Sequence, residues 1–276
     1  MKVAAINDLS GFGKCSLTTD ITVLAAMGIE CCPLPTAVLS AQTGYPSYYS
    51  QDLTGIIPEY LREWKNQGEN FDGIITGFMM SSLQASNSLD FLKAFKSGNT
   101  KILVDPVMGD DGKTYKNFSS DLLNTIKDMV KEADIITPNL TELCLLTDEN
   151  PEKIMAFKGD DLIGEIRRLS MLLGGNNGKI IAVTGIPLSK DDVIGNFIME
   201  NSSFKVITTQ SNGIHYSGTG DLFAATLLGG YLKGNSAFDA ADLASQFIHA
   251  SVKDTPICSS PRAGISYENN LKMLMK

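Results

Sequence analysis

Short apolar runs rich in β-branched residues recur along this chain, separated by segments long enough for a helix, and this rhythm restricts the fold most. Because the runs lack the alternation of strands exposed on one face, they are typical of parallel strands with helices on both faces. The pattern predicts an α/β fold around a central, mostly parallel sheet. The runs are KVAAI (2–6), CPLPTAVL (32–39), GIITGF (73–78), KILVDPV (101–107), ADIITPN (133–139) and KIIAVTG (179–185).

The C-terminal part of the chain has a different pattern. The stretch VIGNFIMENSSFKVITTQ (193–210) predicts a hairpin that turns at residues 200–203 and adds antiparallel strands at one edge of the sheet. Two helical segments follow it, at 218–234 and 237–255. We find no repeat, low-complexity tract or linker, and 276 residues can share one core. We therefore expect a single domain over residues 1–276.

Charge and composition exclude several classes of partner. A net charge of −8, without any Lys/Arg-rich run, argues against nucleic-acid binding, which needs a basic surface. No apolar stretch approaches the roughly 18 to 20 residues of a membrane span, and no signal-like segment opens the chain, so we expect a cytoplasmic protein without a membrane partner. Five cysteines without a CxxC pair suit a reducing compartment, and two distant histidines argue against a His-based metal site.

The stretch NDLSGFGKCSLTTD (7–20) resembles two different nucleotide-binding loops. A Walker A loop would need glycine where Asp8 stands, and a carboxylate there would repel phosphate. A Rossmann fingerprint would need an acid at the end of the second strand, whereas Glu30 lies at its start. We therefore expect a strand-to-helix turn in which Gly11 and Gly13 permit a tight entry. Asp8 would lie at the carboxyl end of the first strand, where open α/β sheets bind ligands.

Phosphate chemistry is better placed in YSGTGDLFAATLLGG (216–230). Gly218, Thr219 and Gly220 can present successive backbone N–H groups, and the following helix directs its positive end to the same place. Asp221 at the helix start would suit a general base that deprotonates a hydroxyl while those N–H groups hold the developing negative charge. The alternative is that Asp221 only caps its helix.

Two further motifs follow predicted strands. VDPVMGDDGKTY (104–115) leaves its strand with Asp105, and ITPNLTEL (136–143) leaves another with Asn139 and Glu142. Carboxylates at these strand ends could hold magnesium against nucleotide phosphates. Each residue taken singly could also belong to a turn or a cap. Together with the Gly-rich turn, however, they indicate phosphoryl transfer.

DPVMGDDGKTY, ITPNLTE and GTGDLFAA, in this order and at these distances, resemble the ribokinase superfamily and most closely its pyridoxal kinase (vitamin B6 kinase) branch. The resemblance covers nearly the whole chain and implies a ribokinase-like fold. It also implies a transferase of vitamin B6 salvage that uses ATP to phosphorylate the 5′-hydroxymethyl group of pyridoxal, pyridoxine or pyridoxamine. Such kinases use Mg²⁺, often with K⁺ or another monovalent cation, and are commonly homodimers.

The resemblance also implies roles for single residues. Asp221 falls on the catalytic base, and Gly218, Thr219 and Gly220 fall on the anion hole. LSAQTGY (39–45) matches the substrate segment and brings Thr43 to the pyridine ring, and ITGF places Phe78 at the aromatic wall of the pocket. We expect Asp8 to hydrogen-bond the ring nitrogen or the ring hydroxyl. The positions near the nucleotide and the metal are Asp105, Thr137, Glu142 and Thr184, with Asp105 and Glu142 as the metal ligands.

Two alternative functions remain open at this point. Many pyridoxal kinases have a Ser-His pair where this chain has Asp8, which instead resembles hydroxymethylpyrimidine kinases of thiamine synthesis. Those kinases typically show GTGC and lack the GDDGKTY continuation, whereas Asp221 makes this motif GTGD. A non-catalytic nucleotide-binding protein on the same fold is the other alternative, although neither the base nor the glycines are lost here. Residues 43–55 could form a mobile cover or a dimer contact.

Overall fold

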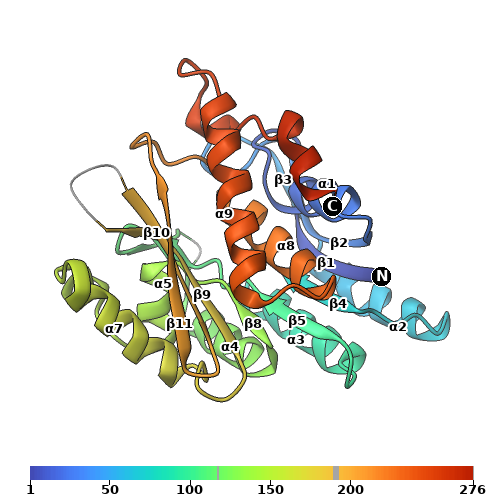
Figure 1. The fold of residues 1–276 in the computed structure, drawn as a ribbon. Coiled ribbons are helices and arrows are strands. Elements are labelled where there is room, and N and C mark those ends of the chain that lie inside the picture. The colour runs from blue at the N-terminus through green and yellow to red at the C-terminus, as the bar shows by residue number, and fades with distance from the viewer. Residues whose placement is uncertain (117, 189–192, 276) are drawn as a thin grey trace.

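Nine strands of the described chain form one sheet, in the order β11-β10-β9-β8-β5-β4-β1-β2-β3 (Figure 1). The computed structural model describes residues 1–116, 118–188 and 193–275. The strands from β9 to β2 pair in parallel, whereas β10 and β11 at one edge and β3 at the other are antiparallel. The predicted α/β fold with a mostly parallel sheet is therefore confirmed.

Every predicted run contains a strand, and residues 193–210 form the predicted hairpin. β3 and a small second sheet, β6 paired with β7, were not predicted, so antiparallel strands lie at both edges instead of one. The strands are β1 (Lys2–Ser10), β2 (Glu30–Leu39), β3 (Ser50–Asp52), β4 (Gly73–Thr76), β5 (Lys101–Val104), β6 (Gly109–Asp110), β7 (Lys113–Thr114), β8 (Ile135–Ile136), β9 (Ile180–Pro187), β10 (Val193–Glu200) and β11 (Ser203–Gln210).

Helices cover both faces of the sheet (Figure 1). One face carries α1 (Ser16–Ala26), α8 (Thr219–Leu232) and α9 (Ala237–Asp254), together with the 3-10 helix η3 (Glu268–Leu274). The other face carries α2 (Ile57–Asn66), α3 (Ser82–Phe95), α4 (Ser120–Glu132), α5 (Leu140–Leu146), α6 (Pro151–Met155) and α7 (Gly159–Leu172). Two short 3-10 helices, η1 (Thr54–Ile56) and η2 (Pro261–Ala263), lie in loops.

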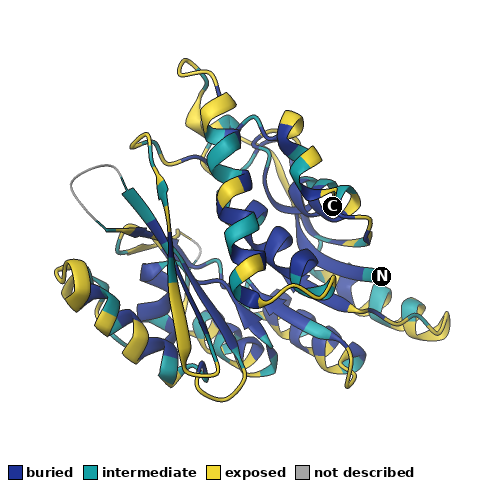
Figure 2. Ribbon diagram, in the orientation of Figure 1, coloured by how far each residue is buried: buried dark blue, intermediate teal, exposed yellow. Residues whose placement is uncertain are grey.

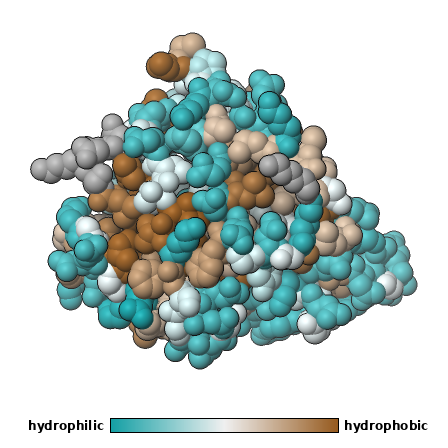
Figure 3. All heavy atoms as spheres, viewed as in Figure 1, coloured by the Kyte–Doolittle hydropathy of each residue, from teal (hydrophilic) through white to brown (hydrophobic). Residues whose placement is uncertain are grey.

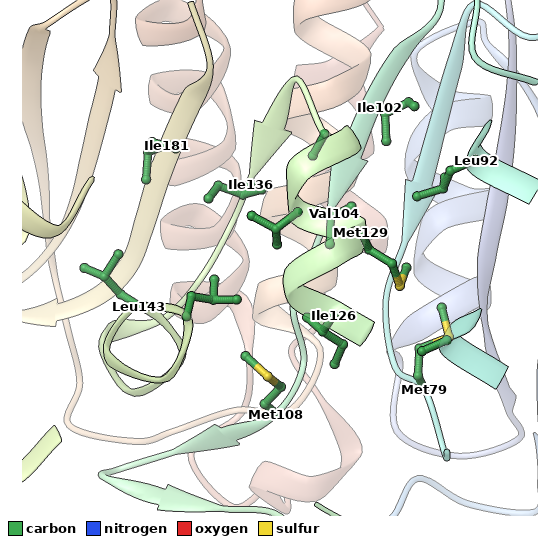
Figure 4. Packing of buried hydrophobic residues seen from close by; sticks show 14 of the residues in the cluster. Met79, Leu92, Ile102, Val104, Met108, Ile126, Met129, Ile136, Leu143 and Ile181 are labelled. Atoms are coloured by element: carbon green, nitrogen blue, oxygen red, sulfur yellow. The ribbon is translucent and has the colours of Figure 1, made fainter. Parts of the chain in front are cut away.

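Strand alternation divides the core into two layers. In β1, Ala4 and Ile6 join the cluster under α3 and α4, while Val3 and Ala5 join the cluster under α1 and α8. The central strands are buried on both faces (Figure 2), as their continuous apolar runs require. Figure 4 shows part of the first cluster, where side chains of β5 and β8 pack against those of α4 and α5.

The turn between β1 and α1 has the predicted form. Gly13 takes φ +130°, and a side chain there would run into Gln42, so this close approach needs glycine. Lys14 and Ser16 also have positive φ, which makes the turn tight before α1 begins at Ser16. The β1 strand itself runs on to Ser10 beyond a register shift between Asn7 and Leu9, so Asp8 lies at this irregularity. The strand therefore carries Asp8 just before its end.

None of the described helices is both long and apolar enough to cross a bilayer. Within the described residues all five cysteines are free thiols, as the absence of a CxxC pair predicted.

Candidate active site

The Gly-rich turn before α8 has the geometry of an anion-binding site. Gly218 is the N-cap of α8 at φ +81°, and α8 begins at Thr219, so the N–H groups of its first turn have no partner within the helix. A side chain on Gly218 would lie 2.2 Å from the carbonyl oxygen of Lys14, so this crossing of two loops needs glycine. The first-turn N–H groups and the helix dipole thus favour an anion at this place.

Asp221 is the third residue of α8, and its carboxylate is held by groups of other segments. Asn7 Nδ2 donates to Asp221 Oδ1 over 3.2 Å, and the backbone N–H of Ser16 also donates to this carboxylate. Burial raises the pKa of Asp221 to about 6, and the charge of Asp8 adds to the shift. These partners lie on β1 and at the start of α1, so the Asp221 carboxylate joins the first turn of α8 to both segments.

Asp105 reaches the same turn from the end of β5. Its Oδ1 accepts a hydrogen bond of 3.0 Å from the Thr137 hydroxyl, and its Oδ2 lies 3.9 Å from where a side chain on Gly220 would begin. Burial, followed by the charge of Asp221, raises the pKa of Asp105 to about 8. The structure therefore brings Asp105, Thr137 and Asp221 together around Gly220.

Glu142 is buried, and both of its carboxylate oxygens accept hydrogen bonds from backbone N–H groups. Its Oε1 accepts from the N–H of Met108 at 3.0 Å and its Oε2 from the N–H of Asn139 at 2.9 Å, while Asn139 Oδ1 accepts from the N–H of Glu142. This capping box begins α5 and also holds the start of the β6–β7 hairpin. Thr184 lies within β9 and forms an isolated parallel bridge with Asn139. Glu142 is thus close enough to Asp105 for the charge of Asp105 to raise its pKa, whereas Thr184 lies on β9, which β8 separates from β5.

Asp8 is only 5% exposed, and its two oxygens accept from the hydroxyls of Ser10 (2.7 Å) and Ser16 (2.6 Å). Burial raises the pKa of Asp8, and these two hydrogen bonds oppose the shift. Phe78 is half-buried, and its N–H donates to Asn7 Oδ1. Both residues therefore lie around Asn7, which links them to Asp221.

Thr43 is exposed on a segment that is fastened to the Gly-rich turn. The side chain of the preceding residue, Gln42, donates from Nε2 to Ser217 Oγ at 2.9 Å and to the Arg262 carbonyl at 3.2 Å. Its Oε1 accepts from the N–H of Gly44 at 2.5 Å. Gln42 thus places Thr43 beside the residues that precede the anion-binding turn.

Four residues of this region were missed from the sequence: Asn7, Asp20, Gln42 and Tyr115. Asp20 is fully buried on α1, and burial and the charge of Asp221 raise its pKa well above the usual range. Burial raises the pKa of Tyr115 as well, and the charges of Glu142, Asp110, Asp105 and Asp221 add to the shift. A signal existed for two of them: Tyr115 ends the GDDGKTY motif, and an aspartate on an apolar helix such as α1 suggests a buried polar contact.

No group of three or more His, Cys, Asp or Glu in the described ranges could hold a metal ion by itself. A metal bound here would need ligands from a substrate as well. Two surface cavities of about 410 and 590 Å³ lie away from the carboxylates, the first lined by α4 and α7 and the second by α7 and the β10–β11 hairpin. The second is mostly apolar, and Figure 3 shows apolar side chains gathered on the face that carries this hairpin.

Residues 13–263 match the family model described as phosphomethylpyrimidine kinase. The chain belongs to this family. Because the match spans nearly all of the site, the chain is an enzyme of the phosphotransferase class, and the kinase predicted from the sequence is confirmed. The matched range includes Asp105, Glu142 and Asp221.

Individual relatives agree with this assignment. Pyridoxal kinase of Dictyostelium discoideum is 28% identical over 242 residues, which cover 83% of this chain and 77% of the relative. A Bacteroides thetaiotaomicron structure with pyridoxal, described as a candidate phosphomethylpyrimidine kinase, is 36% identical with a TM-score of 0.92, covering 99% of this chain and 95% of that one. Pyridoxal kinase of Lactobacillus plantarum is 25% identical with a TM-score of 0.88, covering 99% and 96%. The predicted ribokinase-like fold and the resemblance to pyridoxal kinases are confirmed.

Proposed function

We propose that this chain transfers the γ-phosphoryl group of ATP to the 5′-hydroxymethyl group of pyridoxal, pyridoxine or pyridoxamine. The observation that carries the proposal is the Asp221 carboxylate at the first turn of α8, beside N–H groups that have no partner within the helix. A base that activates a hydroxyl explains why a half-buried carboxylate lies next to an anion site. The Bacteroides relative that was crystallised with pyridoxal supports the substrate class.

In this reaction Asp221 accepts the proton of the substrate hydroxyl as the oxygen attacks the γ-phosphorus. A new O–P bond forms, the bond to the ADP oxygen breaks, and the electron pair leaves with ADP. The N–H groups of Thr219 and Gly220, with the positive end of α8, stabilise the charge that develops on the transferred group. A carboxyl with a pKa of about 6 is ionised at neutral pH and still basic enough to take a proton.

Asp105 and Glu142 would hold Mg²⁺ against the phosphates of ATP, with Thr137 and Thr184 beside the nucleotide. Asp105 fits this role, because its Oδ2 faces Gly220 while only Oδ1 is held by Thr137. Glu142 has both oxygens on backbone N–H groups, so only its remaining lone pairs are available, directly or through water. A Mg²⁺ ion bound there would neutralise part of the negative charge of the ATP phosphates. We also propose a stimulating monovalent cation such as K⁺.

The substrate ring would lie between Asp8, Thr43 and Phe78. Asp8 keeps lone pairs beyond its two bonds to serine hydroxyls and could accept from the protonated ring nitrogen or the ring hydroxyl. Phe78, half-buried at the end of β4, offers an apolar face to the ring. Thr43 would approach from the segment that Gln42 fastens to Ser217.

A hydroxymethylpyrimidine kinase is the second candidate, because the matching family model is described as phosphomethylpyrimidine kinase. Initial rates with ATP and each of pyridoxal, pyridoxine, pyridoxamine and hydroxymethylpyrimidine, measured side by side, test the proposal. We expect the highest kcat/KM for one of the three B6 vitamers. A clear preference for hydroxymethylpyrimidine would replace the substrate, and no ATP turnover with any alcohol would favour a non-catalytic nucleotide-binding protein.

We further propose that residues 1–276 act as one domain and associate as a homodimer. The nine strands of the main sheet extend from Lys2 to Gln210, and the proposed site uses residues from Asp8 to Asp221. In the described structure β3 is an edge strand, and exposed Tyr49 directly precedes it, which would suit a contact with a second copy.

A further inference from the structure

Asn7 on β1 is 2% exposed and uses all four hydrogen-bonding positions of its side-chain amide. Its Oδ1 accepts from the N–H groups of Asp8 (3.1 Å) and Phe78 (3.0 Å). Its Nδ2 donates to Asp20 Oδ2 and to Asp221 Oδ1, over 3.2 Å in each case. One amide thus joins the proposed base to the buried carboxyl of Asp20 and to the wall of the proposed substrate pocket.

The partners determine which way this amide points. Two backbone N–H groups face the oxygen, and two carboxylates face the nitrogen. In the flipped orientation the amide oxygen would meet two carboxylates and the NH₂ group would meet two donors, so all four bonds would be lost. The amide lies against Gly77, where a side chain would begin only 2.4 Å from Asn7 Nδ2, so this close approach needs glycine. The amide is therefore fixed before any substrate binds.

We infer that Asn7 is a positioning residue for phosphoryl transfer, which holds the carboxylate of Asp221 toward the anion-binding turn and is itself anchored by Asp20. The inference rests on the proposed role of Asp221 as the base. The hydrogen bond from Nδ2 stabilises the charged form of Asp221, which is the form that accepts a proton. Removing this donor should reduce turnover more than substrate binding.

The surroundings make this donor important, because the other ionisable groups near Asp221 are acidic. Negative neighbours disfavour the ionised base, whereas a neutral donor favours it. The ammonium of Lys14, whose backbone passes Gly218, is directed away to Glu268 and the Ile265 carbonyl. The acidic neighbours are Asp8 on β1, Asp20 on α1 and Asp105 after β5. Cys15 and Tyr115 are also close, but burial raises the pKa of this thiol and this phenol, so both are neutral at pH 7.

Asn7→Asp tests the inference with almost no change of shape. The variant keeps an oxygen for the N–H groups of Asp8 and Phe78 but replaces the donor by a third carboxyl oxygen facing Asp20 and Asp221. We expect kcat for pyridoxal to fall roughly tenfold or more at pH 7, with KM within about threefold of the parent. The acid limb of the pH profile of kcat should move up by about one unit or more.

Asn270→Asp is the matched control, because Asn270 is a buried asparagine that donates to an aspartate, Asp254, outside this site. It should lose stability but keep the parent pH profile. Should Asn7→Asp not fold, Gly77→Ala displaces the amide and is expected to lower kcat in the same way.

Three results would overturn the inference: an unchanged kcat and pH profile in folded Asn7→Asp, the same profile shift in Asn270→Asp, or a rise of KM alone. Asp221→Asn is measured in parallel. If that variant keeps its turnover, the proposed base has failed; if it is inactive while Asn7→Asp is normal, only the role of Asn7 has failed.

Discussion

Asp221 could serve as a base or only as part of a helix start, and a change of one atom separates the two roles. Asp221→Asn keeps the size of the side chain and most of its capping ability but cannot accept the hydroxyl proton. We expect kcat to fall by about 10² to 10⁴, with affinities for ATP and pyridoxal within several-fold of the parent. Rates from single-turnover assays, with Kd values from calorimetry, measure both. A folded variant that keeps more than about a tenth of its turnover would contradict the base role.

Asp20 predicts a pH dependence of stability. Burial and the charge of Asp221 raise the pKa of Asp20 in the folded protein. The contribution of Asp20 to the free energy of unfolding is therefore fully present below its pKa in the unfolded chain, and it is lost as the pH rises through its pKa in the folded protein. Asp20→Asn resembles the protonated form at every pH. The free energy of unfolding of Asp20→Asn, relative to that of the parent, should therefore grow by about 1.4 kcal/mol per pH unit above pH 5, until the pH passes the pKa of Asp20 in the folded parent.

Urea unfolding at pH 5, 6 and 7 measures this slope for Asp20→Asn. Asp128→Asn is the control, because Asp128 is exposed beside Lys131 and its pKa is lowered, which removes any gain with rising pH. A difference between Asp20→Asn and the parent that stays constant over this range would mean that Asp20 is ionised in the folded protein.

At the scale of single elements, the turn into α8 should act through its backbone. The Thr219 hydroxyl donates to the Tyr216 carbonyl, away from the anion-binding N–H groups, so Thr219→Ala should be mild. A valine at Gly220 would fill the space between the turn and Asp105 Oδ2, so Gly220→Val should lower kcat/KM severely. Steady-state kinetics with circular dichroism as the folding control tests this. Greater damage from Thr219→Ala would contradict a backbone anion hole.

The elements that the sequence predicted are those with a strong apolar pattern. The six runs became strands, five of them largely buried and β2 partly exposed, because burial on both faces leaves a continuous apolar signal. The hairpin turned where expected. β3 is a polar, exposed segment of three residues, and β6 and β7 have two residues each, so neither leaves such a signal. The contact of Asn7 with Asp20 also could not be predicted, because it depends on how α1 packs on β1.

The motifs near strand ends were predictable for a related reason. The carboxyl ends of parallel strands meet at one edge of a sheet, so Asp105, Glu142 and Asp8 could be expected there from strand positions alone. The hydrogen bonds of Glu142 were not predictable, since only the structure shows that both of its oxygens accept from backbone N–H groups. A motif thus predicts where a side chain lies better than which partners it takes.

At the scale of the whole molecule, substitutions near the sheet edge at β3 can distinguish a dimer contact from a mobile cover over the substrate. Phe12 and Tyr49 are 69% and 66% exposed, and β3 has a free edge in the described structure. If a second copy packs here, Tyr49→Glu should convert a homodimer to a monomer in sedimentation equilibrium, because it buries an unpaired charge in the contact. Leu172→Glu on α7, also exposed, should leave the dimer intact. A Tyr49→Glu protein that remains dimeric but raises KM for pyridoxal would instead assign this segment to a cover, and a parent that is monomeric at micromolar concentration would exclude the dimer.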